Sequence, residues 1–149
     1  MNNHPLVMLL DGFLHFIKAE SRGKNRGFTR EHIFRILKTE IFPSFPTDTI
    51  DKLENYVLKY HIRFSTWQKP WAFRDYRSID QEPAPLSDKE ITKQNTANTW
   101  REKVLSLLNP FLAGWKGALS AEDKCAFLYR WLTCLLYTSP SPRDGLLSR

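Results

Sequence analysis

The 149-residue sequence contains only two cysteines, and no apolar run approaches the roughly 20 residues that a bilayer-spanning helix needs. Two cysteines, Cys125 and Cys134, are too few for a disulfide framework and are not spaced as a metal clip. The N-terminal stretch lacks the positive flank of a signal peptide, and Asp11 interrupts its apolar residues. These absences argue against a disulfide-rich secreted domain and a membrane protein, and they predict a cytoplasmic location.

Residues that could form an active site are also scarce. No glycine-rich loop precedes a Lys-Ser or Lys-Thr pair, so the chain cannot cradle a nucleotide in that way. The histidines His4, His15, His32 and His61 are never spaced to place two metal ligands on one helical face. We therefore expect no catalytic residue, no cofactor-binding residue and no metal ligand in this chain.

The overall composition is that of an ordinary globular domain. Hydrophobic residues make up 42% of the chain and aromatic residues 13%, which is enough for one modest domain with one core. Lysine and arginine number 22 against 16 acidic residues, so the formal net charge is +6. A positive balance of this size fits an anionic partner such as nucleic acid without requiring one.

Apolar residues recur at helical spacing in several segments, and no segment shows the alternation of a strand. We expect a first helix over about residues 5–20, with Asn3 as its N-cap. Four further helices are expected to begin at Thr29, at Thr47 or Asp48, at Ser87 or Asp88, and at Ser120. Asn109-Pro110 should kink or restart the fourth of these helices. The prediction is an all-α fold with one aromatic-rich, non-helical segment over residues 61–76.

Two helical halves are expected, residues 1–80, which include the aromatic-rich segment, and residues 87–133. Residues 81–86, which include Pro83-Ala84-Pro85, are expected to form an exposed linker.

Residues 134–149 are expected not to be natural protein sequence. The stretch from Cys134 to Asp144 can be encoded without conflict by the transposase adapter of sequencing libraries, read through as coding sequence. The alternative is a natural disordered tail, in which Ser-Pro-Ser-Pro is ordinary. The adapter interpretation predicts that the gene was cut near Thr133.

Two features could bind a ligand. The first is the basic loop, which carries Arg22, Lys24, Arg26 and Arg30 among glycines that would let the backbone approach a phosphate. The alternative, which is favoured, is a solvated surface turn, because loops are normally polar.

The second feature is the aromatic-rich segment. Trp67 or Trp71 could stack on unpaired bases while neighbouring cations follow the backbone. The favoured alternative is a loop pinned to the core by its own aromatic rings.

The stretch from Ile50 to Tyr60, followed by the stretch from Trp67 to Asp80, resembles the AddB/RexB family of B subunits of bacterial ATP-dependent helicase–deoxyribonucleases. The resemblance covers about residues 2–133 and is strongest at Leu53-Glu54-Asn55-Tyr56 and at Tyr76-Arg77-Ser78. Asn3-His4-Pro5-Leu6 and Arg35-Ile36-Leu37-Lys38-Thr39-Glu40 agree with it. One departure is His61-Ile62-Arg63-Phe64, which stands where the family usually has a more glycine-rich turn.

The resemblance implies an irregular helical domain that is part of an insertion similar to the 2B subdomain of superfamily 1 helicases. The parent protein would process double-strand breaks with ATP, magnesium and an iron–sulfur cluster held outside this region, and its partners would be DNA and the A subunit. The fragment itself would serve as scaffold and as wall of the DNA channel. The alternative is a free-standing helical protein–protein interaction module, with the aromatic-rich segment as its interface.

Overall fold

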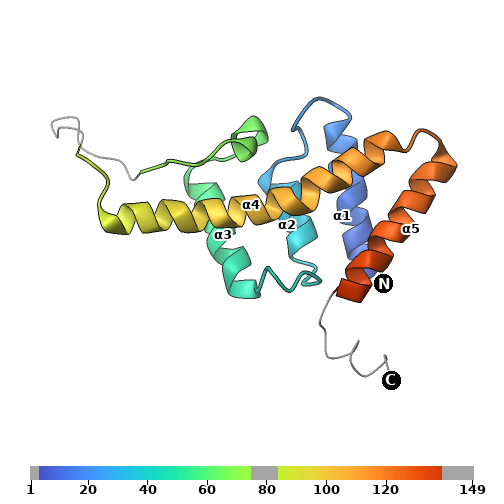
Figure 1. The fold of residues 1–149 in the computed structure, drawn as a ribbon, viewed down its shortest axis with the longest axis horizontal. Helices are drawn as coiled ribbons and strands as arrows, with labels where there is room; N and C mark the ends of the chain where they lie inside the picture. Colours follow the sequence, from blue (N-terminus) through green and yellow to red (C-terminus); the bar gives the residue numbers. More distant parts are fainter. Residues whose placement is uncertain (1–3, 75–83, 139–149) are drawn as a thin grey trace, which may run out of the picture.

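The computed structural model describes residues 4–74 and 84–138, and within these ranges all regular secondary structure is helical and there is no strand (Figure 1). Its elements are α1 (Pro5–Glu20), α2 (Arg30–Leu37), α3 (Thr47–Lys59), the short 3-10 helix η1 (Phe64–Gln68), α4 (Asp88–Gly117) and α5 (Ala121–Thr138). The predicted all-α fold is confirmed.

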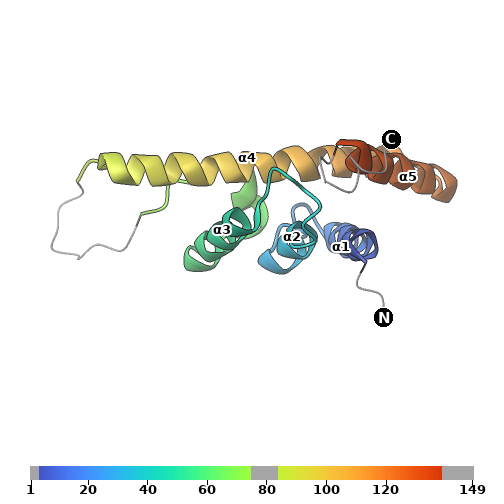
Figure 2. The same ribbon diagram turned by 90° about the horizontal axis from the view of Figure 1, so that it is seen from below.

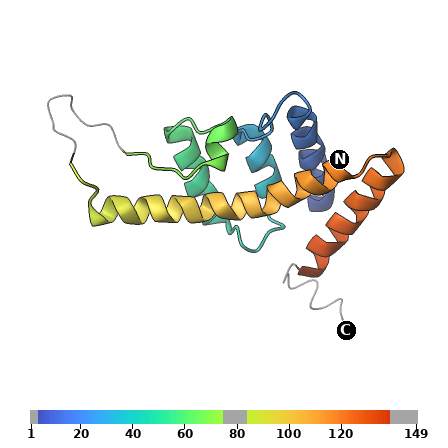
Figure 3. The same cartoon turned by 45° about the horizontal axis from the view of Figure 1, so that its top comes forward.

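The helices form two layers. Helices α1, α2 and α3 lie side by side in a row, and the long helix α4 crosses one side of that row (Figure 2). Helix α5 turns back from the end of α4 and runs down beside α1 (Figures 1 and 3). The core fills the space between the layers, and its fully buried members include Leu9, Phe13, Phe16, Ile33, Ile36, Leu53, Trp67, Val104, Leu108 and Phe111.

Three expected helix starts are confirmed by hydrogen bonds to backbone N–H groups. The Thr29 hydroxyl accepts the N–H of His32 at 3.3 Å at the start of α2. At the start of α4, Ser87 accepts the N–H of Glu90 while the Glu90 carboxylate accepts the N–H of Ser87, which completes a capping box. At the start of α5, the Ser120 hydroxyl accepts the N–H of Asp123 at 3.0 Å.

The cap of α1 differs from the expectation. His4, not Asn3, is the N-cap, because its Nδ1 accepts the N–H of Leu6 at 3.1 Å and its backbone is extended. Asn3 lies outside the described residues. An imidazole nitrogen can accept this hydrogen bond in place of a short polar side chain, but histidine is not among the residues preferred at the N-cap.

Helix α4 runs as one 30-residue helix through Pro110, so of the two predicted alternatives at Asn109-Pro110, a kink or a restart, the restart is wrong. Its axis bends along its length in Figure 1, as expected where a proline removes one backbone hydrogen bond. Buried residues on both sides of the proline, Leu108 and Phe111, hold the two turns against the same core. Instead of capping a new helix, the Asn109 amide exchanges two hydrogen bonds with the amide of Gln68, each 3.3 Å long.

Parts of three predictions fall outside the described residues. These are residues 81–83 of the expected linker, the Tyr76-Arg77-Ser78 part of the resemblance, and residues 139–149 of the tail. Helix α5 includes residues 134–138, and Leu135 is partly buried against the core. The boundary at residue 133 stays a prediction.

Candidate nucleic-acid interface

The basic loop, residues 21–30, joins α1 to α2 and is closed by Glu20, the last residue of α1. The two carboxylate oxygens of Glu20 accept the N–H groups of Asn25 at 3.2 Å and of Gly27 at 2.7 Å. Asn25 adopts a left-handed backbone with φ 66°, a conformation that asparagine tolerates better than most residues. Its side-chain oxygen accepts a hydrogen bond of 3.2 Å from Gln68. The basic loop is therefore anchored to the end of α1 through Glu20 and to η1 through Gln68.

Gly27 is required by packing. A Cβ atom at this position would lie 2.5 Å from the Phe16 ring and 2.9 Å from the Phe16 backbone oxygen. Gly27 is buried, so its backbone is not presented to a ligand, and the expectation that glycines expose the backbone to phosphate does not apply here.

The four predicted cations do not have equal surroundings. Arg22, Lys24 and Arg26 are exposed, and among the described residues no carboxylate lies within 4.0 Å of their charged groups. Arg30 is half-buried and forms ion pairs with Glu54 at 3.4 Å and with Glu31 at 3.5 Å. Three of the four cations are thus available to an anion, while the fourth is already neutralised.

The two predicted tryptophans lie in the core. Trp67 is 0% exposed and Trp71 is 2% exposed, so neither ring face is open to an unpaired base. Trp71 is held by hydrogen bonds from its side chain and from its backbone. Its indole N–H donates to the Thr66 carbonyl at 3.0 Å. Its backbone N–H and carbonyl both bond to the Asn98 side-chain amide, each at 2.8 Å.

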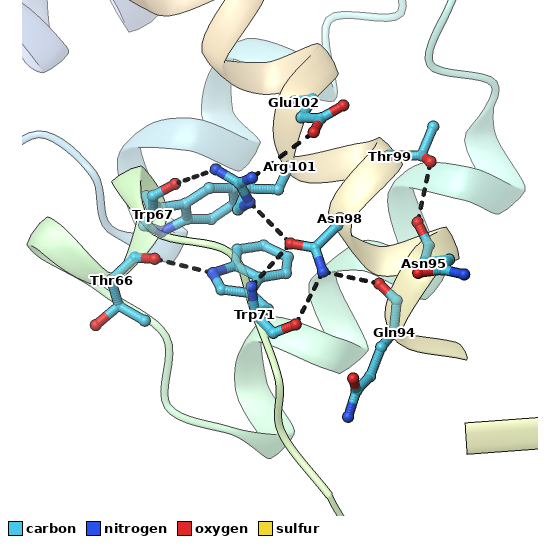
Figure 4. A network of polar contacts seen from close by, with 9 residues as sticks. All are labelled: Thr66, Trp67, Trp71, Gln94, Asn95, Asn98, Thr99, Arg101 and Glu102. Carbon is cyan, nitrogen blue, oxygen red and sulfur yellow. Dashed lines mark hydrogen bonds and ion pairs between the residues drawn. The ribbon is translucent and has the colours of Figure 1, made fainter. Parts of the chain in front are cut away.

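Figure 4 shows how α4 fixes the aromatic-rich segment. The Asn98 side chain also accepts the Nε–H of Arg101 at 3.0 Å, and Arg101 donates to the Trp67 carbonyl at 3.3 Å. Arg101 is 7% exposed, so its stem and guanidinium are enclosed between α4 and η1. The segment is pinned by its rings and by α4, as the favoured interpretation has it.

Sequence reasoning placed Arg63 and Phe64 in the aromatic-rich segment, but it missed that this pair, which precedes and begins η1, meets the basic loop. The guanidinium carbon of Arg26 lies 4.8 Å from the centre of the Phe64 ring, and that of Arg63 lies 5.4 Å from it. A shallow depression of about 440 Å³ is lined by Phe64, Arg22 and Arg26, together with Ala19, Thr29 and His32. The signal in the sequence is the non-glycine turn at residues 61–64.

The electrostatic surroundings of this depression favour negative charge. Burial lowers the pKa of His32, Glu31 opposes that shift, and the positive charges of Arg35 and Arg22 lower the pKa further. His32 is therefore kept neutral over a wider pH range than a free histidine, and the positive charge of the depression comes from arginines that do not titrate near neutrality.

Glu20→Ala is expected to lower the free energy of unfolding by about 1–3 kcal/mol, because two loop N–H groups lose a charged acceptor. Urea denaturation followed by circular dichroism measures the change. The matched control is Glu102→Ala, an exposed glutamate of α4, for which we expect a change within about 0.5 kcal/mol. Equal effects of the two substitutions would show that Glu20 does not anchor the loop.

Within residues 4–74 and 84–138, no cluster of three or more histidine, cysteine or acidic side chains is placed to hold a metal ion. The same ranges contain no helix whose length and apolar character would let it span a membrane.

Comparison with known proteins finds relatives that are named as the B subunit of an ATP-dependent helicase/deoxyribonuclease. The chain is 30% identical over 135 residues to the protein of that name from Exiguobacterium sibiricum. It is 31% identical over 141 residues to that from Oceanobacillus iheyensis, and 30% identical over 142 residues to that from Bacillus subtilis. Each match covers 89% of this chain and 11% of the relative. No known family profile matches the chain.

Proposed function

Because the chain belongs to the AddB/RexB family, we propose that it is a piece of the B subunit of a bacterial helicase–nuclease that repairs DNA double-strand breaks. The observation that carries this proposal is the similarity along 89% of the chain to proteins named as helicase/deoxyribonuclease B subunits. The chain spans only about a tenth of the length of these relatives, so the larger part of such a protein lies elsewhere. The parent would resect broken ends and support recombination in the cytoplasm.

In this proposal the chain supplies scaffold and wall rather than catalysis. A single core runs through α1 to α4, which suits a rigid helical element of the kind found in a 2B-type insertion. The ATP and magnesium expected of the parent would bind outside this chain. The described residues offer no metal-binding cluster, and two cysteines cannot supply the four ligands that an iron–sulfur cluster usually takes, so the cluster would also be held elsewhere.

The proposed partners are DNA and the A subunit. The three exposed cations Arg22, Lys24 and Arg26 support contact with DNA. Exposed apolar side chains on α1, Val7 at 53% and Leu14 at 43%, support a protein contact on another face.

Simultaneous replacement of Arg22, Lys24, Arg26 and Arg30 by glutamine is expected to weaken binding of the 149-residue chain to single-stranded and forked DNA, about equally across sequences. Three of these cations are free, and each phosphate contact to a single strand adds about 0.7 to the slope of log affinity against log salt concentration. We therefore expect the slope to fall by about 2 on single strands. Fluorescence anisotropy titrations at two salt concentrations measure it.

The matched control replaces four exposed lysines of α3 and α4, Lys52, Lys89, Lys93 and Lys103, so that the net charge falls by the same amount. An unchanged slope in the loop variant, or an equal fall in both variants, would return the basic loop to a solvated turn.

A further inference from the structure

Two parts of the chain that are distant in sequence meet at the Phe64 cleft, which we define as the depression lined by Arg22, Arg26 and Phe64 together with the adjoining depression that Arg63 and Phe64 line. The Phe64 N–H donates to the Phe28 carbonyl at 2.7 Å, and this backbone bond joins the residues after α3 to the end of the basic loop. Arg63 therefore extends the charge of a loop that lies well before it in the sequence.

The backbone of Phe64 is unusual. Its φ is 58°, a left-handed conformation that is an outlier for a bulky residue and carries an energetic cost of order 1–3 kcal/mol. The Phe64 ring is half-buried, and the guanidinium carbons of Arg26 and Arg63 both lie over it. Cation–π attraction holds an arginine over such a ring without neutralising its charge.

Glu31, an acidic side chain at this cleft, pairs with Arg30 and not with the arginines that define the cleft. Among the residues that the structure describes, no carboxylate comes within ion-pair distance of Arg22, Arg26 or Arg63. Thr29, which caps α2, also lines the cleft, so the positive end of that helix lies beside it. Like charges gathered in this way repel one another, and a bound anion relieves the repulsion.

We propose that the Phe64 cleft binds adjacent phosphodiester groups of a single DNA strand, with Arg26 and Arg63 positioned by the Phe64 ring. The inference rests on the proposed function, because it specifies where on this chain the strand lies. Guanidinium groups suit the task because each presents several N–H donors in a fixed plane to phosphate oxygens. Arg63 is then a DNA-binding residue outside the basic loop, and Phe64 is a positioning residue.

The test compares Arg63→Gln with Lys89→Gln in the 149-residue chain, using a short fluorescent oligothymidylate over a range of salt concentrations. Lys89 is exposed in the first turn of α4, at the end of the molecule away from α1 (Figure 1), and its loss changes the net charge equally. We expect Arg63→Gln to reduce affinity several-fold and the salt slope by about 0.7, with Lys89→Gln unchanged. Arg63→Lys should restore the slope but not the full affinity.

Phe64→Leu tests the positioning role, because it keeps every cation but removes the ring. We expect its affinity to fall about as far as that of Arg63→Gln, while thermal unfolding confirms that each variant is folded. Wild-type affinity in Phe64→Leu would overturn the positioning role of the ring.

The possible results separate the two proposals. If the loop variant lowers the slope while Arg63→Gln behaves like Lys89→Gln, this inference fails and the proposed function stands. If the wild-type chain binds no DNA at low salt, both fail. Displacement of the oligothymidylate by inorganic phosphate at constant ionic strength would show a site for free phosphate, and would overturn the assignment to a DNA strand.

Discussion

Replacement of Trp67 by alanine is expected to lower the free energy of unfolding by about 3–5 kcal/mol, as is usual for a large aromatic side chain removed from a core. Trp67 is 0% exposed, and its ring lies 5.0 Å from that of Trp71 and 6.4 Å from that of Phe28 between centroids. Its indole N–H has no hydrogen-bond partner among the described residues. The loss is therefore one of packing and of the cavity left behind.

Urea denaturation measures this loss, with Tyr129→Ala as control, since Tyr129 is 74% exposed and should change stability by less than about 1 kcal/mol. The result also bears on function. A loss below about 1 kcal/mol for Trp67→Ala would mean that the ring is not packed in solution, and the stacking of an unpaired base on Trp67 would again be a credible role.

Asn98→Ala is expected to lower the free energy of unfolding by about 2–4 kcal/mol, although it removes only one small polar side chain. Its amide bonds both backbone groups of Trp71 and the guanidinium of Arg101. After the substitution the backbone N–H and carbonyl of Trp71 and the Nε–H of Arg101 lose these part-buried bonds, and each unpaired group costs about 1–3 kcal/mol.

Asn95→Ala is the matched control, because Asn95 is exposed on the same helix three residues earlier and should change stability by no more than about 0.5 kcal/mol. Similar small effects of both substitutions would contradict the view that α4 pins the aromatic-rich segment through Asn98.

Local patterns predicted the helices well, because periodicity and capping are encoded within a few residues. Thr29, Ser87 and Ser120 could be identified as helix starts from their own neighbourhoods. Whether α4 kinks or restarts at Pro110 could not be decided in this way, since the outcome depends on burial of both adjoining turns against helices that lie far away in sequence.

The candidate site was predicted only in part for the same reason. Arg22 and Arg26 stand out within a short basic loop, whereas Arg63 joins them only after the chain has folded. The pairing of Arg30 with Glu54 is also a long-range contact, and it separates this arginine from the three free cations. Sequence spacing alone could not tell that Arg30 is paired with a carboxylate while Arg22 and Arg26 are not.

The position of α4 across the row of α1, α2 and α3 has a consequence for synthesis of the protein. The ribosome makes the three shorter helices first, and the side of the row that α4 covers stays open to solvent until the residues of α4 have emerged. During that interval Phe13, Ile36 and Leu53 have only part of their final surroundings. Exposed apolar surface of this kind is what chaperones bind and what aggregates when translation stalls. We therefore expect a nascent chain halted before residue 88 to aggregate more readily than the complete 149-residue chain.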